Sequence, residues 1–411
     1  MIFLLTFVNS RCIILIQLET QLISIQVKKD FALMDISVIE LFSGIGAQYQ
    51  ALLNSKHTVK RIATSEIDKD AMLSYAVMHC ELTKEKLHNY TFPTKEEMIE
   101  FLLEKNIGFN FEKNISYNWT RLNIEKIQKY YLAAILSKNL GDISKIQDLP
   151  LADLWTYSFP CQSISVAGKK EGIIKGKTRS GLLYEVERLL ENTKNKPKYL
   201  LLENVKNLIG KNFKPQFDEW IKKLDQLGYN TIYQVLNGRE FNIPQNRERI
   251  FAVSIRKDLN QDYIFPQKQI LNKTIADFLE ENVEQKYYMN NSSVDKILKT
   301  FKITNQELQS MNKSKINILM KIPEFHQRGN VYNPNGVIGC LTATDYKTPK
   351  LIFEKHQVRK LTPKECLRIM GFPDNKIDKL LNMNISNTQL YKQAGNSIIV
   401  NVLTAILNNL N

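Results

Sequence analysis

The fold is decided by the stretch Ile36–Ala47, which reads ISVIELFSGIGA. Its β-branched first half, Ile36–Leu41, predicts a buried strand, and its glycine-rich second half predicts a tight turn into a helix that ends near Leu53. A second strand is expected at Val59–Thr64, followed by a helix over Lys69–Cys80. Alternating strands and helices are typical of a doubly wound, mostly parallel sheet, so we predict an α/β fold.

The strand pattern is interrupted once and then fades towards the C-terminus. Residues 81–140 are rich in Lys, Glu, Asn and Tyr and contain a capping box at Thr94 and Glu97, which predicts a solvated helical insertion. Further strands are expected at Leu154–Ser158, Tyr199–Leu202, Thr231–Leu236 and Arg249–Ile255, with helices at Leu182–Leu190 and Pro215–Leu227. We therefore predict a main domain over 35–265, a smaller domain poor in sheet signals over 266–360, and a return to the main domain over 361–411.

The first 34 residues contain two short apolar runs, 2–8 and 12–18, separated by a polar break. Neither reaches the roughly 20 residues that a membrane span needs, and the basic start and cleavage site of a secretory signal are missing. We expect 1–34 to be an unstructured or non-native extension, upstream sequence joined to the gene, and we expect no membrane contact.

Composition favours a polyanionic partner. The 411 residues include 56 Lys and Arg against 42 Asp and Glu, which gives a net charge of +14 and a pI near 9.3. Nucleic acid is the first candidate. The five cysteines are scattered and never spaced as Cys-x-x-Cys, so neither a disulfide framework nor a metal site is expected, and a reducing cytosol fits.

The glycine turn predicts a nucleoside site. Gly44 and Gly46 follow the first strand, and Glu66 ends the next strand about 20 residues on, where a carboxylate accepts hydrogen bonds from a ribose. Because Tyr49 occupies the place of the third glycine of a dinucleotide fingerprint, S-adenosylmethionine fits better than NAD. Asp142 would either accept from the adenine amine or cap the turn that follows it.

A cysteine, an acid and two arginines follow the later strands. Cys161 stands behind Pro160 directly after a buried strand, and Glu203 follows the strand Tyr199–Leu202, so both are expected at the ligand-binding edge of the sheet. Arg247 and Arg249 alternate, which places both side chains on one face of an extended segment. The alternatives are a buried structural cysteine and a solvated charged strand.

Together these motifs resemble those of the DNA cytosine-5 methyltransferase family. The resemblance covers 35–80, 141–265 and 338–411, and its ordered motifs are Glu40–Gly46, Glu66, Gly141–Ile143, Pro160–Gln162, Glu203–Val205, Gln245–Arg249, Leu361–Pro373 and Gln393–Ile398. Thr178–Glu185 looks like the CpG-methylating subgroup of small-genome bacteria. The family likeness implies methyl transfer from S-adenosylmethionine to carbon 5 of cytosine in duplex DNA.

The resemblance also assigns the chemistry. A Cys161 thiolate would add to carbon 6 of a flipped-out cytosine, because carbon 5 alone is a poor nucleophile. Glu203 would donate at ring nitrogen 3 and Arg249 would stabilise charge at the carbonyl oxygen. The base that removes the carbon 5 proton is not identified, and water would serve.

Contacts follow from the resemblance position by position. The cofactor site is implied to comprise Phe42, Gly44, Gly46, Glu66, Asp142, Pro160, Leu182, Asn396 and Ser397, and the DNA contacts Ser165, Arg247 and Thr342. Ala167 departs from a family pattern in which a polar residue fills the emptied base stack. Residues 266–360 would form a target-recognition domain.

Other functions are weighed against single features. A tRNA cytosine-5 methyltransferase would carry Pro-Pro-Cys where this chain has Phe159 before Pro160, a binding protein would lack the nucleophile or the acid, and an oxidoreductase would need the third glycine. We expect a monomeric modification enzyme of the bacterial cytosol, with a cognate restriction endonuclease acting independently, or else an orphan enzyme.

Overall fold

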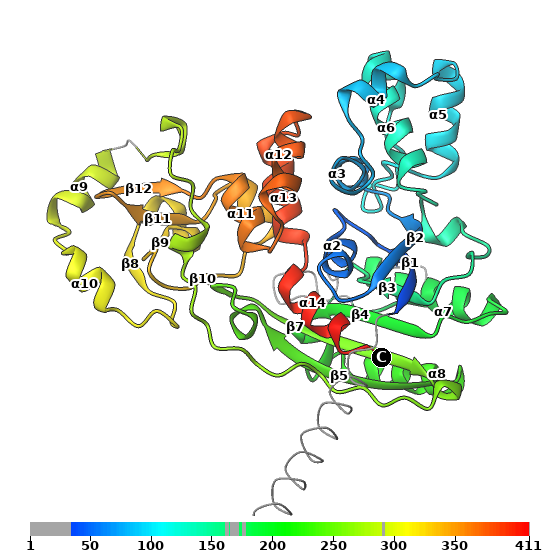
Figure 1. Ribbon diagram of the computed structural model, residues 1–411. Helices are drawn as coiled ribbons and strands as arrows, with labels where there is room; N and C mark the ends of the chain where they lie inside the picture. Colours follow the sequence, from blue (N-terminus) through cyan, green and yellow to red (C-terminus); the bar gives the residue numbers. More distant parts are fainter. Residues whose placement is uncertain (1–33, 161–163, 165–171, 175–177, 290–291, 411) are drawn as a thin grey trace, which may run out of the picture.

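A six-stranded sheet forms the centre of the main lobe (Figure 1). The computed structural model describes residues 34–160, 164, 172–174, 178–289 and 292–410. In spatial order the strands are β2 (Thr58–Ser65), β1 (Asp35–Leu41), β3 (Leu154–Tyr157), β4 (Tyr199–Val205), β7 (Glu248–Arg256) and β5 (Tyr229–Asn237). Only β7 runs against its neighbours β4 and β5. The predicted doubly wound, mostly parallel sheet is confirmed.

Helices cover both faces of this sheet because its strands alternate their side chains between two cores. Tyr199 and Leu201 belong to one core, while Leu200 and Leu202 belong to the other. The first core also includes α2 (Ala47–Leu53), α3 (Lys69–His79) and α14 (Val400–Asn408), and the second includes α7 (Leu183–Asn192) and α8 (Lys214–Gln226).

Two strand ends differ from the expectation. β4 continues through Val205, so Glu203 lies within the strand and not after it, paired with Phe251 of β7. In the sequence, the charged Glu203 indicates the end of a buried strand. In the structure, pairing with β7 keeps Glu203 inside the sheet. The segment before Gly141, where a strand end would place Asp142 at the sheet edge, is not a strand, because Asn139 forms only an isolated bridge to Thr64.

The interval 81–140 holds α4 (Lys84–Asn89), α5 (Lys95–Glu104) and α6 (Ile124–Leu136). Its inner side chains, among them Met98, Trp119 and Leu132, are buried in the same core as α3. The insertion is therefore less solvated than expected, because its apolar residues recur at helical spacing between the many charges.

The second lobe contains a four-stranded sheet, which corrects the expectation of few strands in 266–360. Its order is β12 (Gln357–Lys360), β11 (Leu351–Glu354), β9 (Asn330–Tyr332) and β8 (Ile318–Lys321), beside α9 (Ser292–Thr300) and α10 (Asn305–Ser310). Strands of three or four residues are too short to show alternation in the sequence.

The C-terminal helices lie between the two lobes. Figure 1 shows α11 (Pro363–Ile369), α12 (Asp374–Asn382) and α13 (Asn387–Asn396) there, with α12 packed against α3 and α11 against α13. Among the described residues, none of the helices has the length and apolar character required to cross a bilayer.

Candidate active site

Most of the predicted site residues line one cavity of about 260 Å³ at the carboxyl edge of the main sheet. They come from segments that are far apart in the sequence and comprise Phe42, Gly44, Glu66, Asp142, Pro160, Leu182, Glu203, Arg247, Arg249, Asn396 and Ser397. Gly46 and Thr342 are not among the lining residues. Cys161, Ser165 and Ala167 lie outside the described residues, so their roles stay predictions.

The glycine turn shapes one wall of the cavity. Phe42, Gly44 and Gly46 have φ angles of 59°, 54° and 82°, and the chain reverses there before α2 begins. A Cβ at Gly46 would lie 2.6 Å from Cδ2 of His79, so Gly46 serves the packing of the turn. A Cβ at Gly44 would meet no atom within 4 Å, which leaves space beside the turn for a ligand.

Glu66 braces this wall and faces the cavity. Its Oε2 accepts from the Gly44 N–H at 2.8 Å and its Oε1 accepts from the Asp68 N–H at 2.7 Å. Burial raises the pKa of Glu66 to about 7, with the nearby Asp68 charge acting in the same direction. A carboxylate offers about four acceptor positions, so two remain for a diol.

Asp142 caps the turn that follows it, which is one of the two alternatives that its sequence position allowed. Its Oδ1 caps the short turn that follows by accepting from the Ser144 N–H at 3.0 Å, which confirms the capping interpretation. Its Oδ2 accepts from Nδ2 of Asn106, in the insertion, at 2.6 Å. The residue also lines the cavity, so contact with a cofactor stays a prediction.

Glu203 and Arg249 form an ion pair in the cavity wall. Nε of Arg249 lies 3.3 Å from Oε1 of Glu203, across the pair of strands β4 and β7. Burial raises the pKa of Glu203, although the positive charges of Arg249 and Arg247 oppose the shift. Burial thus makes this carboxyl group retain its proton to a higher pH than an exposed glutamate, beside a cation.

Polar side chains bind backbone carbonyls on both sides of Cys161 in the sequence. Asn204 Nδ2 donates to the Phe159 carbonyl at 3.0 Å, and Ser180 Oγ donates to the Pro160 carbonyl at 2.7 Å. Beyond the loop, Asn207 Nδ2 donates to the Ile164 carbonyl at 2.5 Å. The strand that supplies Glu203 thus also positions the entry to the cysteine loop.

Arg247 is buried and bound to backbone carbonyls. Its guanidinium donates to Leu341 at 2.8 Å, to Ser397 at 2.6 Å and to Gly395 at 3.1 Å. These bonds join the main sheet, the segment after β10 (Ile338–Gly339) and the end of α13. The predicted contact of Arg247 with DNA stays a prediction. In the structure, Arg247 holds these three segments together through its hydrogen bonds.

Thr342 is engaged in a turn. Its Oγ1 donates to Oδ1 of Asp345 at 2.6 Å, and its backbone lies so close to α13 that a Cβ at Gly395 would be 2.0 Å from the Thr342 carbonyl carbon. The DNA contact predicted for Thr342 also stays a prediction.

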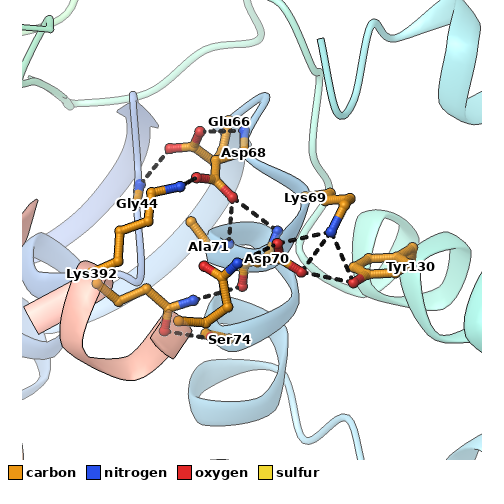
Figure 2. A network of polar contacts seen from close by, with 11 residues as sticks. Gly44, Glu66, Asp68, Lys69, Asp70, Ala71, Ser74, Tyr130 and Lys392 are labelled. Carbon is orange, nitrogen blue, oxygen red and sulfur yellow. Dashed lines mark hydrogen bonds and ion pairs between the residues drawn. The ribbon is translucent and has the colours of Figure 1, made fainter. Parts of the chain in front are cut away.

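Sequence reasoning missed an ion pair at the edge of the cavity. Lys392 Nζ lies 2.8 Å from Oδ2 of Asp68, and both residues are among those that line the cavity (Figure 2). Two local signals could have drawn attention to them. Asp68 has the position of an N-cap before a helix, and Lys392 directly precedes the Gln393 motif.

Comparison with known proteins identifies the family to which this chain is similar. Residues 103–411 match the model of the C-5 cytosine-specific DNA methylase family. The chain is 39% identical over 380 residues to the type II methyltransferase M2.ScrFI of Lactococcus lactis subsp. cremoris, covering 91% of this chain and 99% of that protein. It is 33% identical to the orphan methyltransferase M.SssI of Spiroplasma monobiae, covering 90% and 96%.

A solved structure shares the fold. The Dnmt2 methyltransferase of S. pombe superposes with a TM-score of 0.55 at 20% identity, covering 91% of this chain and 97% of that one.

Proposed function

Because the chain belongs to the C-5 cytosine-specific DNA methylase family and is a DNA cytosine-5 methyltransferase, we propose that it takes its methyl group from S-adenosylmethionine and adds a Cys161 thiolate to a flipped cytosine. The observation that carries this proposal is the Glu203–Arg249 pair, which lies in the same cavity as the glycine turn and Glu66. An acid, a cation and a nucleoside-binding wall thus face one space.

The residues present fit the proposed methyl donor. Glu66 has acceptor positions left for ribose hydroxyls, and the open space beside Gly44 would hold the nucleoside. Phe42, Asp142, Pro160, Leu182, Asn396 and Ser397 complete the wall. When bound, the group supplies an electrophilic methyl on a sulfonium centre.

The catalytic proposal concerns what the chain's own side chains do to the base. Cys161 forms a bond to carbon 6, Glu203 delivers a proton to ring nitrogen 3, and the Arg249 guanidinium stabilises charge at the carbonyl oxygen. The neutral form of Glu203 that burial favours is the form this role requires. Extrusion of the base costs a few kcal/mol, which the cationic surface and the smaller domain would offset through their contacts with DNA.

The cellular role follows the relatives. M2.ScrFI is a type II methyltransferase and M.SssI is an orphan one. We favour a monomeric modification enzyme of a restriction system in the bacterial cytosol, with an endonuclease that acts independently. The 266–360 region would select the DNA sequence, and 1–33 would take no part. Met34 belongs to the folded domain instead, since its carbonyl accepts from the Thr58 N–H at 3.0 Å.

The proposal is tested by incubating the protein with methyl-labelled S-adenosylmethionine and plasmid DNA, with tRNA as the control substrate. We expect label in DNA at carbon 5 of cytosine and none in tRNA. The Cys161→Ser variant should lose methyl transfer and keep DNA binding, because a serine alkoxide is not available at neutral pH without an adjacent base. Turnover by this variant at the wild-type rate would contradict the nucleophile assignment.

A further inference from the structure

The first turn of α3 is held from two sides by the Asp70 network, which consists of Lys69, Asp70, Tyr130 and Gln389. Figure 2 shows Lys69, Asp70 and Tyr130 of this network. Tyr130 Oη, on α6 of the insertion, donates to Oδ1 of Asp70 at 2.7 Å. Gln389 Nε2, on α13, donates to Oδ2 of Asp70 at 3.0 Å. The Asp70 carboxylate therefore connects α6 of the insertion to α13.

The donors in this network have fixed roles. Burial raises the pKa of the Tyr130 hydroxyl, and the Asp70 charge adds to the shift, so the hydroxyl stays protonated. Lys69 Nζ lies 2.8 Å from each Asp70 oxygen and 4.9 Å from the ring centroids of Tyr117 and Tyr130. Toward a carboxylate, Gln389 can only present its amide nitrogen.

The same turn of α3 sets both walls of the cavity. On one side, Asp68 caps the helix while its N–H donates to Glu66. On the other side, Gln393 of α13 donates to the Asp70 carbonyl at 3.0 Å and accepts from Ser74 Oγ at 3.0 Å. Because α13 ends at Asn396, its attachment to α3 determines where Asn396 and Ser397 enter the cavity.

We propose that Tyr130, Asp70 and Gln389 are positioning residues for the methyl donor, and that the insertion 81–140 strengthens donor binding through them. This inference rests on the proposed function, in which the cavity takes S-adenosylmethionine. The network touches the helices that form the walls and not the reacting atoms. Its loss should therefore lower affinity for the donor and leave the chemical step unchanged.

The first test exchanges donor and acceptor within the network. Gln389→Glu is nearly isosteric but places a carboxylate against Asp70, so the Kd for S-adenosylmethionine, measured by calorimetry, should rise by about tenfold or more. The double variant D70N/Q389E supplies an amide donor at position 70 toward the new carboxylate and should recover most of the affinity. Equal affinities of Q389E and wild type, or no recovery in the double variant, would overturn the inference.

The second test removes one hydroxyl. Tyr130→Phe should raise the Kd and the KM for the donor by about three- to tenfold and leave kcat unchanged, because it removes only the hydrogen bonds of one hydroxyl, to Asp70 and from Lys69, and keeps the ring contacts. Tyr131→Phe is the matched control, since Tyr131 lies on the same helix with its ring against Phe101. Both variants should show the wild-type thermal midpoint within a few degrees.

The outcomes separate the two proposals. Failure of the wild-type protein to bind S-adenosylmethionine overturns the cofactor assignment and with it this inference. Normal wild-type binding with equal affinities for Y130F and Y131F overturns the inference alone.

Discussion

At the scale of single residues, Glu203 shows how burial and neighbouring cations set the chemistry of a carboxyl group. Burial raises its pKa, while Arg249 and Arg247 stabilise the charged form and hold the side chain in place. A neutral acid next to a cation can give up its proton as negative charge develops on a base. In the proposed mechanism, Arg249 would face the carbonyl oxygen of that base.

We expect Glu203→Gln to lower kcat by about 10²- to 10⁴-fold, because glutamine keeps the shape of the side chain but has no proton to transfer. The Kd for S-adenosylmethionine should change little. Rate measurements with calorimetry check both expectations. The matched control is Glu248→Gln, which alters an exposed carboxylate paired with Lys206 beside Arg249.

The pH dependence gives this prediction a second readout. Since the neutral form of Glu203 is the donor and its pKa is raised, wild-type kcat should fall as the pH increases through that pKa. The decline should be missing in the E203Q variant. Loss of donor binding without a change in kcat would show that the acid has been misplaced.

At the scale of elements, β1 ends in a buried carboxyl group that organises the glycine turn. Glu40 accepts from the Tyr49 N–H of α2 at 3.0 Å and from the hydroxyl of Tyr75 on α3. Burial raises its pKa from 4.5 to about 7, against the lowering effects of the Tyr75 hydrogen bond and the Arg61 charge. The strand is thereby joined to both helices that flank the turn.

Glu40→Gln is predicted to become more stable relative to wild type as the pH rises. Between pH values of about 4.5 and 7 the folded protein holds a proton on Glu40 that the unfolded chain has released, so the wild-type stability from this group falls across that range. Glutamine does not titrate, so the difference in unfolding free energy should move by about 3 kcal/mol in favour of E40Q.

Urea unfolding of both proteins at about pH 5 and pH 8 measures this difference. Asp35→Asn, at the exposed start of the same strand, is the control and should show a far smaller change. A difference between E40Q and wild type that is independent of pH would contradict the raised pKa.

How far the elements could be predicted depends on whether their signal is local. The strand predicted at Ile36–Leu41, which the structure extends to Asp35, and the glycine turn were predictable because a β-branched run and turn-forming glycines act over a few residues. The extension of β4 through Glu203 was missed because its burial comes from neighbouring strands. The Asp70 network has no local pattern, since its donors come from α6 and α13, which meet only in the folded chain.

At the scale of the whole molecule, the hydrophobic cores define the lobes better than the sequence boundaries do, with one core on each face of the main sheet and a further core in the second lobe. The second lobe has its own core, which includes Val294, Met320 and Phe353. By contrast, Ile275 and Leu341 lie within the predicted 266–360 region but belong to the first core of the main lobe. The segment from Ile338 to η10 (Ala343–Tyr346) is also tied to the main lobe through Arg247.

The chain as a whole carries a net charge of +14. Positive charge attracts DNA irrespective of its sequence, and this attraction weakens as the salt concentration rises. It therefore accounts for DNA affinity but not for the choice of target sequence. Sequence choice requires contacts from a few side chains to base edges. We therefore expect specificity to lie in the second lobe and affinity to be shared by the two.

The last prediction follows from these physical boundaries. Exchange of residues 287–337 for the equivalent region of a relative with another target should transfer that relative's target, because this segment includes α9, α10, β8 and β9 while it spares Ile338 and Leu341. Exchange of the full 266–360 region should lower the thermal midpoint more, since it replaces Ile275, Ile338 and Leu341 of the first core of the main lobe, of which 287–337 holds only Tyr332 among the described buried residues. Bisulfite sequencing of plasmid DNA from expressing cells shows which cytosines each chimera methylates.

The insertion provides the control for that exchange. A chimera that replaces 81–140 should keep the original target, because the insertion contacts α3 and lies away from the second lobe (Figure 1). We expect this chimera to differ in its affinity for S-adenosylmethionine instead, through the loss of Tyr130. An active 287–337 chimera that still methylates the original site would place recognition elsewhere, and the residues to test next would then be those of η10, which joins the second lobe to α13.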